Sequence, residues 1–348
     1  MKILINTPYL SLLGGVANHY LGLKDYWSET VLYNQIGRRG VTQGAGKYTL
    51  LVDVLKFLWK ILIFRPDIIL LNPSLARNAV LRDTFFLRIA KIFNKKVAVF
   101  FHGFNKKNLK EINRDSLVRN LNKCECIFVL AQEFVDDLRM WGVAAPIHLT
   151  TTKVMDRMVG DINAERRSGN VGTILFLARI AENKGIFIAL KSFKQILEIY
   201  PELHLKVVGD GPALNEARSM CESENVKNVT FTGALTGEDL INAFKESDLY
   251  LLPTYYEGMP TSVLEAMAFG LPVITRPVGG LCSFFKNGIM GEMVNSYEPS
   301  DFTKAILPYI QDKSKTRQAA IYNINYAKEN FLASKVASNL ETVLRKYI

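Results

Sequence analysis

Two glutamates separated by seven residues stand in the segment that offers the most chemistry. Glu257 and Glu265 belong to the run Glu-Gly-Met-Pro-Thr-Ser-Val-Leu-Glu, which lies between two apolar runs typical of buried strands. The hydroxyl-bearing residues Thr261 and Ser262 predict the start of a helix, with one hydroxyl as its N-cap. Backbone amides at that helix N-terminus, from Gly258 onward, would favour an anion. Glu257 would precede the helix, and Glu265 would lie near its first turn. The alternative for Glu265 is an ordinary helix carboxylate without a binding role.

Two cations flank a second predicted turn, in the run Ala-Arg-Ile-Ala-Glu-Asn-Lys-Gly. Arg179 leaves the end of a predicted strand over residues 173–177, and Lys184 precedes a predicted helix over 186–199. A guanidinium fork and a lysine point charge at one edge of a sheet form a natural clamp for a diphosphate. A solvated charge pair in a loop is the alternative interpretation.

Two glycine-containing turns also follow predicted strands. Gly209 and Gly211 lie in Val-Val-Gly-Asp-Gly-Pro, where Pro212 is expected to open the next helix. Gly14 and Gly15 follow the first strand, where residues without a Cβ would let the backbone approach a phosphate or an acceptor. Each pair has a structural alternative as a simple turn.

His102 comes directly after a predicted strand over 96–101. At the carboxyl end of a parallel strand its side chain would point to the mouth where ligands bind, although a capping role is the alternative. The other histidines match no motif and are expected to be structural or at the surface: His19, His148 and His204. The four cysteines show neither disulfide nor zinc spacing, which predicts buried thiols and a reducing compartment: Cys124, Cys126, Cys221 and Cys282.

Apolar runs alternate with amphipathic stretches along the chain, and these elements must position the residues above. Strands are expected over 2–6, 67–71, 96–101, 127–130, 173–177, 204–208, 229–231, 249–252 and 272–275. Helices are expected over 47–63, 84–93, 109–123, 186–199, 213–223, 236–246, 262–269 and 333–347. Runs that are apolar on both faces and separated by helices predict parallel sheets covered on both sides. The predicted fold class is α/β, with two Rossmann-like doubly wound domains facing across a cleft.

A polar, charged stretch near residues 150–170 predicts an interdomain linker. We therefore expect an N-terminal domain over 1–160, a C-terminal domain over 161–330, and a terminal helix over 331–348 that packs back towards the first domain. The length of 348 residues fits two domains of ordinary size.

The order and spacing of these segments resemble the C-terminal half of family 4 glycosyltransferases, retaining enzymes of the GT-B fold that include builders of bacterial cell-surface glycans. The family pattern has a strand ending in Gly-Arg, a Lys-Gly, a Val-Gly-Asp-Gly-Pro-like turn and the two glutamates. The resemblance is strong from Thr173 to about Val294 and looser elsewhere. Ala178 departs from the pattern, since the family usually has glycine before the arginine.

The resemblance implies sugar transfer from a donor of UDP or GDP type to a saccharide or lipid-linked acceptor, by a front-face retaining route and without a metal or other cofactor. Arg179 and Lys184 would hold the donor diphosphate, Glu265 the ribose hydroxyls and Glu257 the donor sugar. The catalytic residues implied are Arg179, Lys184, Glu257 and His102. The donor-binding residues implied are Glu265, Gly209, Gly211, Gly258, Met259, Pro260, Thr261, Gly14 and Gly15.

The net charge of +10 lies in the first half of the chain. Residues 1–160 hold 23 Lys and Arg against 12 Asp and Glu, and the stretch from Arg77 to Lys123 holds twelve against three. The run from Leu51 to Phe64 is apolar with interleaved lysines, but a bilayer span needs about 20 residues. With no signal-peptide pattern, these segments predict a cytoplasmic protein on the anionic inner face of a membrane. An ordinary core helix beside a solvated charged face is the alternative.

Two other function classes compete with a transferase. A GT-B relative with other chemistry, such as a nucleotide-sugar epimerase, would share the fold, but the glutamate pair and the Arg-Lys clamp belong to the transferase pattern. A non-catalytic basic scaffold would bind lipid or nucleic acid without turnover. No aromatic RNA-binding signature or helix-turn-helix spacing is present, and nucleic acid is therefore not an expected partner.

Overall fold

Two compact units make up the part of the chain that the structure describes. The computed structural model describes residues 1–12, 14–37, 46–73, 75, 77–103, 112–160, 162 and 168–348. Unit 1 is Met1–Lys153 together with Ala333–Ile348, and unit 2 is Val154–Leu332. These limits differ by a few residues from the 160 and 330 predicted above, because residues 154–160 pack with unit 2, where Val154 N donates to Phe331 O.

Unit 1 is built on a six-stranded parallel sheet with the strand order β2-β1-β3-β4-β5-β6. Its strands are β1 (Lys2–Thr7), β2 (Thr30–Gln35), β3 (Ile68–Leu71), β4 (Lys96–Phe101), β5 (Cys126–Val129) and β6 (Ile147–Leu149). The strand order reverses between β1 and β3. In sheets of this kind a ligand crevice opens at the carboxyl ends of the strands, at that reversal.

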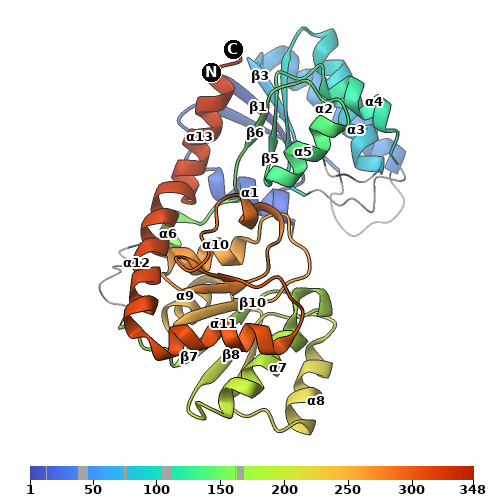
Figure 1. Ribbon diagram of the computed structural model, residues 1–348. Coiled ribbons are helices and arrows are strands. Elements are labelled where there is room, and N and C mark those ends of the chain that lie inside the picture. Colours follow the sequence, from blue (N-terminus) through green and yellow to red (C-terminus); the bar gives the residue numbers. More distant parts are fainter. Residues whose placement is uncertain are drawn as a thin grey trace. The chain divides into compact units, whose positions relative to one another are not determined.

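Helices cover both faces of this sheet (Figure 1). They are α1 (Gly15–Leu23), α2 (Gly46–Phe64), α3 (Arg77–Ile92), α4 (Arg114–Leu121), α5 (Gln132–Met140) and, from the end of the chain, α13 (Ala333–Arg345). Right-handed crossovers place α1 on one face and α2 to α5 on the other, and α13 packs against α1. Glu341 anchors α13, because its carboxylate accepts hydrogen bonds from Ser28 Oγ at 2.5 Å and Glu29 N at 2.9 Å.

Unit 2 repeats the design with the strand order β12-β11-β10-β7-β8-β9, again all parallel. Its strands are β7 (Thr173–Leu177), β8 (His204–Val208), β9 (Val229–Gly233), β10 (Leu249–Leu252), β11 (Val273–Thr275) and β12 (Gly291–Met293). The order reverses between β7 and β10, which therefore flank the expected ligand crevice of this unit.

The helices of unit 2 also form two layers. They are α6 (Asp156–Val159), η3 (Glu182–Lys184), α7 (Ile186–Leu197), α8 (Leu214–Ser223), α9 (Gly237–Lys245), α10 (Thr261–Ala268), η4 (Gly279–Ser283), α11 (Pro299–Gln311) and α12 (Lys313–Asn330). α7 packs with α8 and α11, and α10 packs with α12. The central strands β3, β5 and β10 are buried along their whole length, as two covered faces require. The predicted α/β class with two parallel sheets is confirmed.

Several local predictions are wrong. Three edge strands, β2, β6 and β12, were not predicted, because they are short or rich in polar residues. Hydrogen bonds to the neighbouring strand define them. Helix α8 begins at Leu214, so Pro212 lies before the helix rather than at its first position. Three cysteines are buried, but Cys282 in η4 is exposed.

Candidate active site

The residues predicted from unit 2 all follow strands of one sheet. Arg179 follows β7, Gly209 and Gly211 follow β8, and Glu257 follows β10. Because the strands are parallel, the loops at their carboxyl ends meet at one edge, and β7 and β10 are neighbours there. The structure therefore brings the unit 2 predictions together, whereas His102, Gly14 and Gly15 belong to unit 1.

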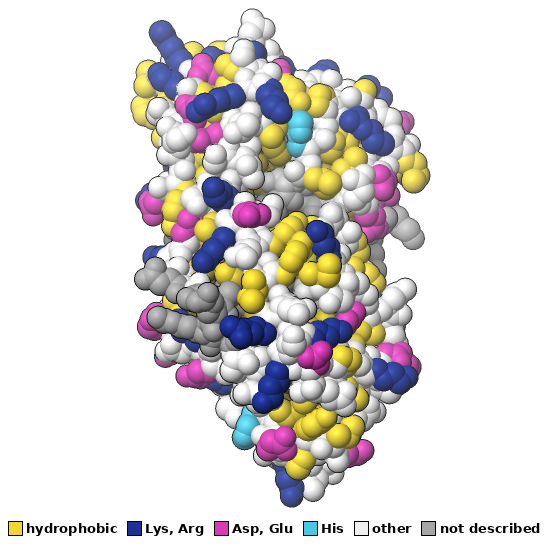
Figure 2. Space-filling view, turned by 60° about the vertical axis from the view of Figure 1, so that its left-hand side comes forward, with side chains coloured by type: hydrophobic (Ala, Val, Ile, Leu, Met, Phe, Trp, Pro, Cys, Tyr) yellow, Lys and Arg dark blue, Asp and Glu magenta, His cyan; other side chains and the backbone are white. Residues whose placement is uncertain are grey.

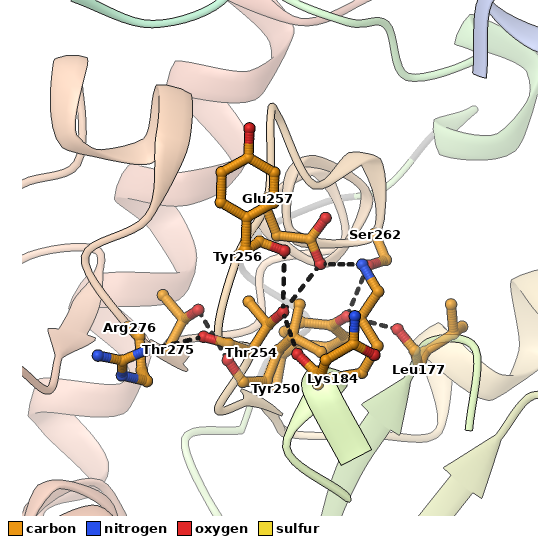
Figure 3. A network of polar contacts seen from close by, with 11 residues as sticks. Leu177, Lys184, Tyr250, Thr254, Tyr256, Glu257, Ser262, Thr275 and Arg276 are labelled. Carbon is orange, nitrogen blue, oxygen red and sulfur yellow. Dashed lines mark hydrogen bonds and ion pairs between the residues drawn. The ribbon is translucent and has the colours of Figure 1, made fainter. Parts of the chain in front are cut away.

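An ion pair between Lys184 and Glu257 lies at the centre of this edge (Figure 3). Lys184 Nζ is 2.5 Å from Glu257 Oε1, and the side chains are 24% and 14% exposed. The hydroxyl of Thr254 is 3.1 Å from the same carboxylate oxygen. A partly buried, charge-assisted contact of this kind fixes both side chains in one geometry. Lys184 and Glu257 therefore form one ion pair, whereas the sequence analysis assigned them two separate roles.

Backbone contacts hold the loops that carry this pair. Tyr255 N donates to Asn183 O at 2.9 Å, which ties the loop after β10 to η3. Gly185 follows Lys184 with φ +78°, in the left-handed region, and a Cβ there would lie 2.1 Å from Pro253 O. Only glycine permits this approach, so Gly185 sets the distance between the two loops.

The helix that carries Glu265 begins differently from the prediction. Its N-cap is Pro260, and no side chain caps it. The hydroxyl of Ser262 instead contacts Tyr250, whose Oη lies 2.7 Å from Ser262 Oγ and 2.8 Å from Leu177 O. Glu265 is the fifth residue of α10, just after its first turn, which agrees with the prediction to within one residue. Burial raises the pKa of Tyr250, and the negative charges of Glu265 and Glu257 raise it further.

The glycines after β8 support the loop that holds Arg179. Gly209 has φ +140°, and a Cβ there would lie 1.9 Å from Ala178 O. A Cβ on Gly211 would lie 2.3 Å from Ile180 O, and Ile180 N donates to Asp210 O. The structural alternative for these glycines therefore has direct support. Arg179 itself is exposed, and within the described ranges no carboxylate pairs with it.

The segment before α10 is held by a further close approach. Gly280 N donates to Gly258 O at 2.7 Å. Gly279, with φ +51°, would place a Cβ 2.2 Å from Glu257 O. Met259 and Pro260 are buried, so their side chains pack inside the unit, and any contact with a donor would come from the backbone.

Sequence reasoning missed several polar residues of this edge. Thr254 contacts Glu257, and Arg276 lies under the same loop with its Nη1 3.4 Å from Thr254 O. The Arg276 guanidinium stacks on the Tyr297 ring at 3.7 Å and is 7% exposed. In Figure 3 it points away from the Lys184–Glu257 pair. Thr254 and Arg276 could have been found from the sequence, because each lies one or two residues after a buried strand.

His102 in unit 1 is surrounded by rings. Phe100 stacks on it with centroids 3.8 Å apart, and His19 meets it edge-on at 4.8 Å. Its Nε2 lies 3.0 Å from Oδ1 of Asn72, a buried residue that the sequence did not single out. Desolvation lowers the pKa of His102 to about 3, so the ring is neutral at physiological pH. His19 is buried, His148 contacts the Tyr347 hydroxyl at 2.7 Å, and His204 is exposed.

Gly14 and Gly15 lie at the N-terminus of α1. Gly14 has φ 170°, which is extended backbone that any residue adopts. A Cβ on either glycine would meet no described atom within 4 Å. Internal packing of the described residues therefore does not require glycine here, and the open space lies beside the backbone.

Sequence comparisons concern mainly unit 2. Residues 161–326 match the family described as Glycosyl transferases group 1. An uncharacterized glycosyltransferase of Methanocaldococcus jannaschii is 30% identical over 140 residues, which are 40% of this chain and 36% of that protein. The GDP-mannose-dependent alpha-mannosyltransferase of Corynebacterium glutamicum is 26% identical over 261 residues, 72% of this chain and 61% of that protein. The chain thus matches between about a third and three fifths of the length of these relatives.

Solved structures match the whole fold. HepE of Anabaena, in complex with UDP and glucose, aligns over 99% of this chain and 100% of its own, with a TM-score of 0.72 and 16% identity. A glycosyltransferase from Rickettsia africae aligns over 99% of this chain and 98% of its own, with a TM-score of 0.76 and 15% identity. The predicted GT-B fold class is confirmed by these likenesses. Residues 161–326 are thus similar to the Glycosyl transferases group 1 family, and this similarity covers slightly less than half of the chain.

Proposed function

We propose that this chain is a retaining glycosyltransferase that moves a sugar from a nucleoside-diphosphate sugar to a saccharide or lipid-linked acceptor. The observation that carries the proposal is the Lys184–Glu257 pair, together with the exposed Arg179 that precedes Lys184 in the loop after β7, inside the segment that matches the group 1 family. HepE was solved with UDP and glucose, and the corynebacterial relative is named for GDP-mannose, which supports a uridine or guanosine donor.

The charges of this edge suit the breaking of a glycosidic bond to a diphosphate. Lys184 has three N–H donors, of which Glu257 Oε1 takes one, so others can reach phosphate oxygens. Arg179 adds a fork of donors, and together the two cations would stabilise the negative charge that develops on the leaving diphosphate. Of the two carboxylate oxygens of Glu257, only Oε1 contacts other described residues. Oε2 can therefore accept a hydrogen bond from a hydroxyl of the donor sugar.

The bond changes of the proposed reaction balance without a further reactant. The bond between the anomeric carbon and the diphosphate oxygen breaks, and the acceptor hydroxyl oxygen bonds to the anomeric carbon on the same face. The acceptor proton passes to the leaving diphosphate. Because two cations and the N-terminus of α10 would face the diphosphate, we propose that the reaction needs no metal ion.

A nucleotide screen tests the donor site. We expect one of UDP, GDP, ADP and dTDP to raise the melting temperature and to give a calorimetric Kd that Glu265→Ala weakens at least tenfold. Glu216→Ala, a helix glutamate of the same unit, is the matched control and should leave binding unchanged. Absence of binding by all four nucleotides would overturn the donor assignment.

A product assay tests the reaction. Incubation with the matching nucleotide sugar and a saccharide acceptor should give a glycoside whose anomeric configuration, read by NMR, equals that of the donor. EDTA should leave the rate unchanged. Inversion of the anomeric carbon would contradict retention, and conversion of the donor sugar without an acceptor would indicate an epimerase instead.

We further propose that the acceptor belongs to a cell-envelope polysaccharide or lipopolysaccharide and is met at an anionic membrane surface by unit 1. Helix α2 is buried along one stripe, where Phe57 and Ile61 lie. Its opposite stripe is apolar and more than half exposed, and it consists of Leu51, Leu55, Trp59, Leu62 and Ile63. A helix with two apolar stripes, only one of them covered, suits insertion at headgroup depth. This stripe disfavours the ordinary core helix left open above.

Helix α3 extends this surface, since Phe57 of α2 packs on Phe86 of α3 at 4.9 Å. Leu81, Phe85 and Ile92 of α3 are exposed, with Arg88 on the same stripe. Not every cation is available, because Lys60 donates to Tyr33 O and Asn34 Oδ1 rather than facing outward.

The neighbouring basic residues differ in how far they are paired. Arg82 pairs with Asp83, and Lys91 pairs with Glu125. Arg77, Arg119 and Lys123 are exposed, and the cations at 106, 107 and 110 lie outside the described residues. For comparison, Figure 2 shows one face of the molecule on which Lys and Arg are interspersed with Asp and Glu.

Vesicle flotation tests the membrane proposal. Within the described residues no helix is long and apolar enough to cross a bilayer, so binding would occur at the surface. We expect flotation with vesicles rich in phosphatidylglycerol and little with pure phosphatidylcholine. Trp59→Ser with Leu55→Ser should abolish flotation, whereas Ile199→Ser, an exposed apolar residue of unit 2, should not. Equal flotation with both vesicle types would contradict the proposal.

A further inference from the structure

The amide of Asn72 joins three groups beneath His102. Asn72 directly follows β3 and is 5% exposed. Its Nδ2 lies 2.7 Å from the carbonyl oxygen of Asn6 and 3.5 Å from that of Leu70. Its Oδ1 lies 2.6 Å from the Tyr20 hydroxyl and 3.0 Å from His102 Nε2. Every polar atom of this amide therefore has a defined neighbour.

Only one orientation of the amide satisfies these neighbours. Carbonyl oxygens can only accept, so the atom that faces Asn6 O must be the amide NH₂ group. A reversed amide would set two acceptors against each other in a buried position, which costs the full desolvation of both. Oδ1 therefore faces Tyr20 and His102, and an amide oxygen can only accept from them.

We propose that Asn72 sets the tautomer of His102: the ring proton resides on Nε2 and is donated to Asn72 Oδ1, so Nδ1 presents a lone pair. Asn72 is thus a positioning residue, and Tyr20 supports it by donating to the second lone pair of Oδ1. Neutral histidine has one donor and one acceptor nitrogen, so fixing the proton on Nε2 makes Nδ1 an acceptor.

The surroundings of His102 keep the ring in this position. Phe100 stacks on one face at an interplanar angle of 25°, while His19 and Tyr20 meet it edge-on. Among the described residues no donor occupies Nδ1. Burial lowers the pKa of His102, and burial together with His102 and Lys153 lowers the pKa of His19. Low pKa values keep both histidine rings neutral, so the tautomer persists across physiological pH.

A lone pair at Nδ1 selects the chemistry of the ligand group that His102 meets. It accepts a hydrogen bond from a hydroxyl, and it repels the oxygens of a phosphate or a carboxylate, which have no proton to donate. Resting on the proposed function, we assign His102 Nδ1 to a hydroxyl of a sugar and not to the diphosphate. The tautomer itself does not depend on that function.

Nitrogen NMR of the histidine side chains tests the tautomer directly. The full chain with ¹⁵N-labelled histidine contains four imidazoles, and His102→Gln assigns the signal of interest. We expect a protonated, pyrrole-type shift at Nε2 and an unprotonated, pyridine-type shift at Nδ1 near neutral pH. A proton on Nδ1, or on both nitrogens, would overturn the proposal.

Substitutions at Asn72 test its role as the cause. Asn72→Leu removes the acceptor and should release the proton, so that both nitrogens show shifts averaged between the two tautomers. Asn120→Leu, a buried asparagine of unit 1 that does not contact His102, is the matched control and should leave the His102 signals unchanged. Unchanged signals in Asn72→Leu would contradict the assignment.

If Asn72→Leu does not fold, Tyr20→Phe keeps the ring shape and provides a milder variant. It should shift the Nε2 signal while the proton stays on Nε2, because Asn6 still fixes the amide. Loss of the Nε2 proton in Tyr20→Phe would contradict the role of Asn6.

Kinetics separate this inference from the proposed function. Asn72→Leu should lower kcat at least tenfold without changing the Kd of the nucleoside diphosphate. A moved proton with unchanged kcat would overturn the role at the sugar and leave the tautomer standing. Absence of nucleotide binding in the unaltered chain would instead defeat the proposed function and leave the NMR result untouched.

Discussion

The two units share one architecture but carry different chemistry at the carboxyl ends of their strands. Unit 2 presents charged side chains: Lys184 and Glu257 are paired, Arg179 is exposed, and Glu265 lies on the following helix. After β3 and β4 of unit 1, the described residues Asn72 and His102 are neutral: the His102 ring stacks on Phe100, and its Nε2 is hydrogen-bonded to Asn72. Both sets lie at strands next to a reversal of the strand order, between β7 and β10 or near β1 and β3.

The difference assigns separate tasks to the two units. Charged side chains can stabilise a charge that develops in a reaction. In unit 2 the loops that carry them are held together by close approaches at glycines and by backbone hydrogen bonds. Desolvated neutral rings cannot supply such charge, but they can hold a hydrogen-bond acceptor in one orientation. Four substitutions or conditions would break or sharpen this contrast.

Removal of the Lys184 cation should have the largest effect. Lys184→Ala takes away a donor to the leaving group and leaves the partly buried Glu257 without its cation, so kcat should fall about 100- to 1000-fold. The control is Lys194→Ala on α7, whose ion pair with Glu224 at 3.0 Å is more exposed. Steady-state kinetics with the nucleotide sugar measure both. An equal loss of kcat in the two variants would show that the Lys184 cation has no specific role in the reaction.

Gly185→Ala should separate the close approach of two loops from backbone strain. Gly185 and Gly237 both have positive φ, so both alanine variants should lose about 1 kcal/mol of unfolding free energy. At Gly185 the Cβ also meets Pro253 O, which should cost about 2 kcal/mol more. Urea unfolding followed by circular dichroism measures stability, and calorimetry measures nucleotide affinity. We expect weaker binding for Gly185→Ala only, and equal stability of the two variants would refute the close contact.

The anchor of the last helix should matter for unit 1. Glu341→Ala removes the acceptor for Ser28 and for the Glu29 amide, so the unfolding free energy of this unit should fall by about 2 kcal/mol. The three tryptophans, at positions 27, 59 and 141, all lie in unit 1, so their fluorescence reports its unfolding. Asn339→Ala, an exposed change on the same helix, should have little effect. Similar midpoints for both variants would argue against the anchor.

The neutral histidine of unit 1 should produce a small dependence of stability on pH. His102 stays unprotonated in the folded unit down to about 3, whereas an unfolded histidine takes up a proton below about 6.5. The unfolded state then binds more protons, so the unfolding free energy falls as the pH falls from about 6.5 towards 3. His19 acts in the same direction.

The slope of that dependence identifies the residue. Between about pH 4 and 6, His102→Phe should reduce the slope of unfolding free energy against pH by about one proton. His204→Phe, at an exposed position, should keep the slope of the unaltered chain. Tryptophan fluorescence in urea at several pH values measures both. An unchanged slope in His102→Phe would place the proton uptake elsewhere.

Strands buried on both faces were predictable from local pattern. β7, β8 and β10 begin and end at the predicted residues. β10 is buried along its whole length, as a strand covered on two sides requires, whereas β8 begins at the exposed His204 and is buried at its last two residues. β6 and β12 have three residues each and mixed polarity. They form because their backbones pair with the neighbouring strands β5 and β11. Local sequence carries no record of that neighbour.

The candidate site shows the same division. The sequence by itself determined which charged and glycine residues follow each strand of unit 2, because residue type and strand end are local properties. Tertiary structure decided that Lys184 pairs with Glu257, 73 residues away, and that Asn72 meets His102 across neighbouring strands. It also decided that the Ser262 hydroxyl is hydrogen-bonded to Tyr250 rather than capping α10. Partners distant in the chain are chosen by packing, and packing depends on every element at once.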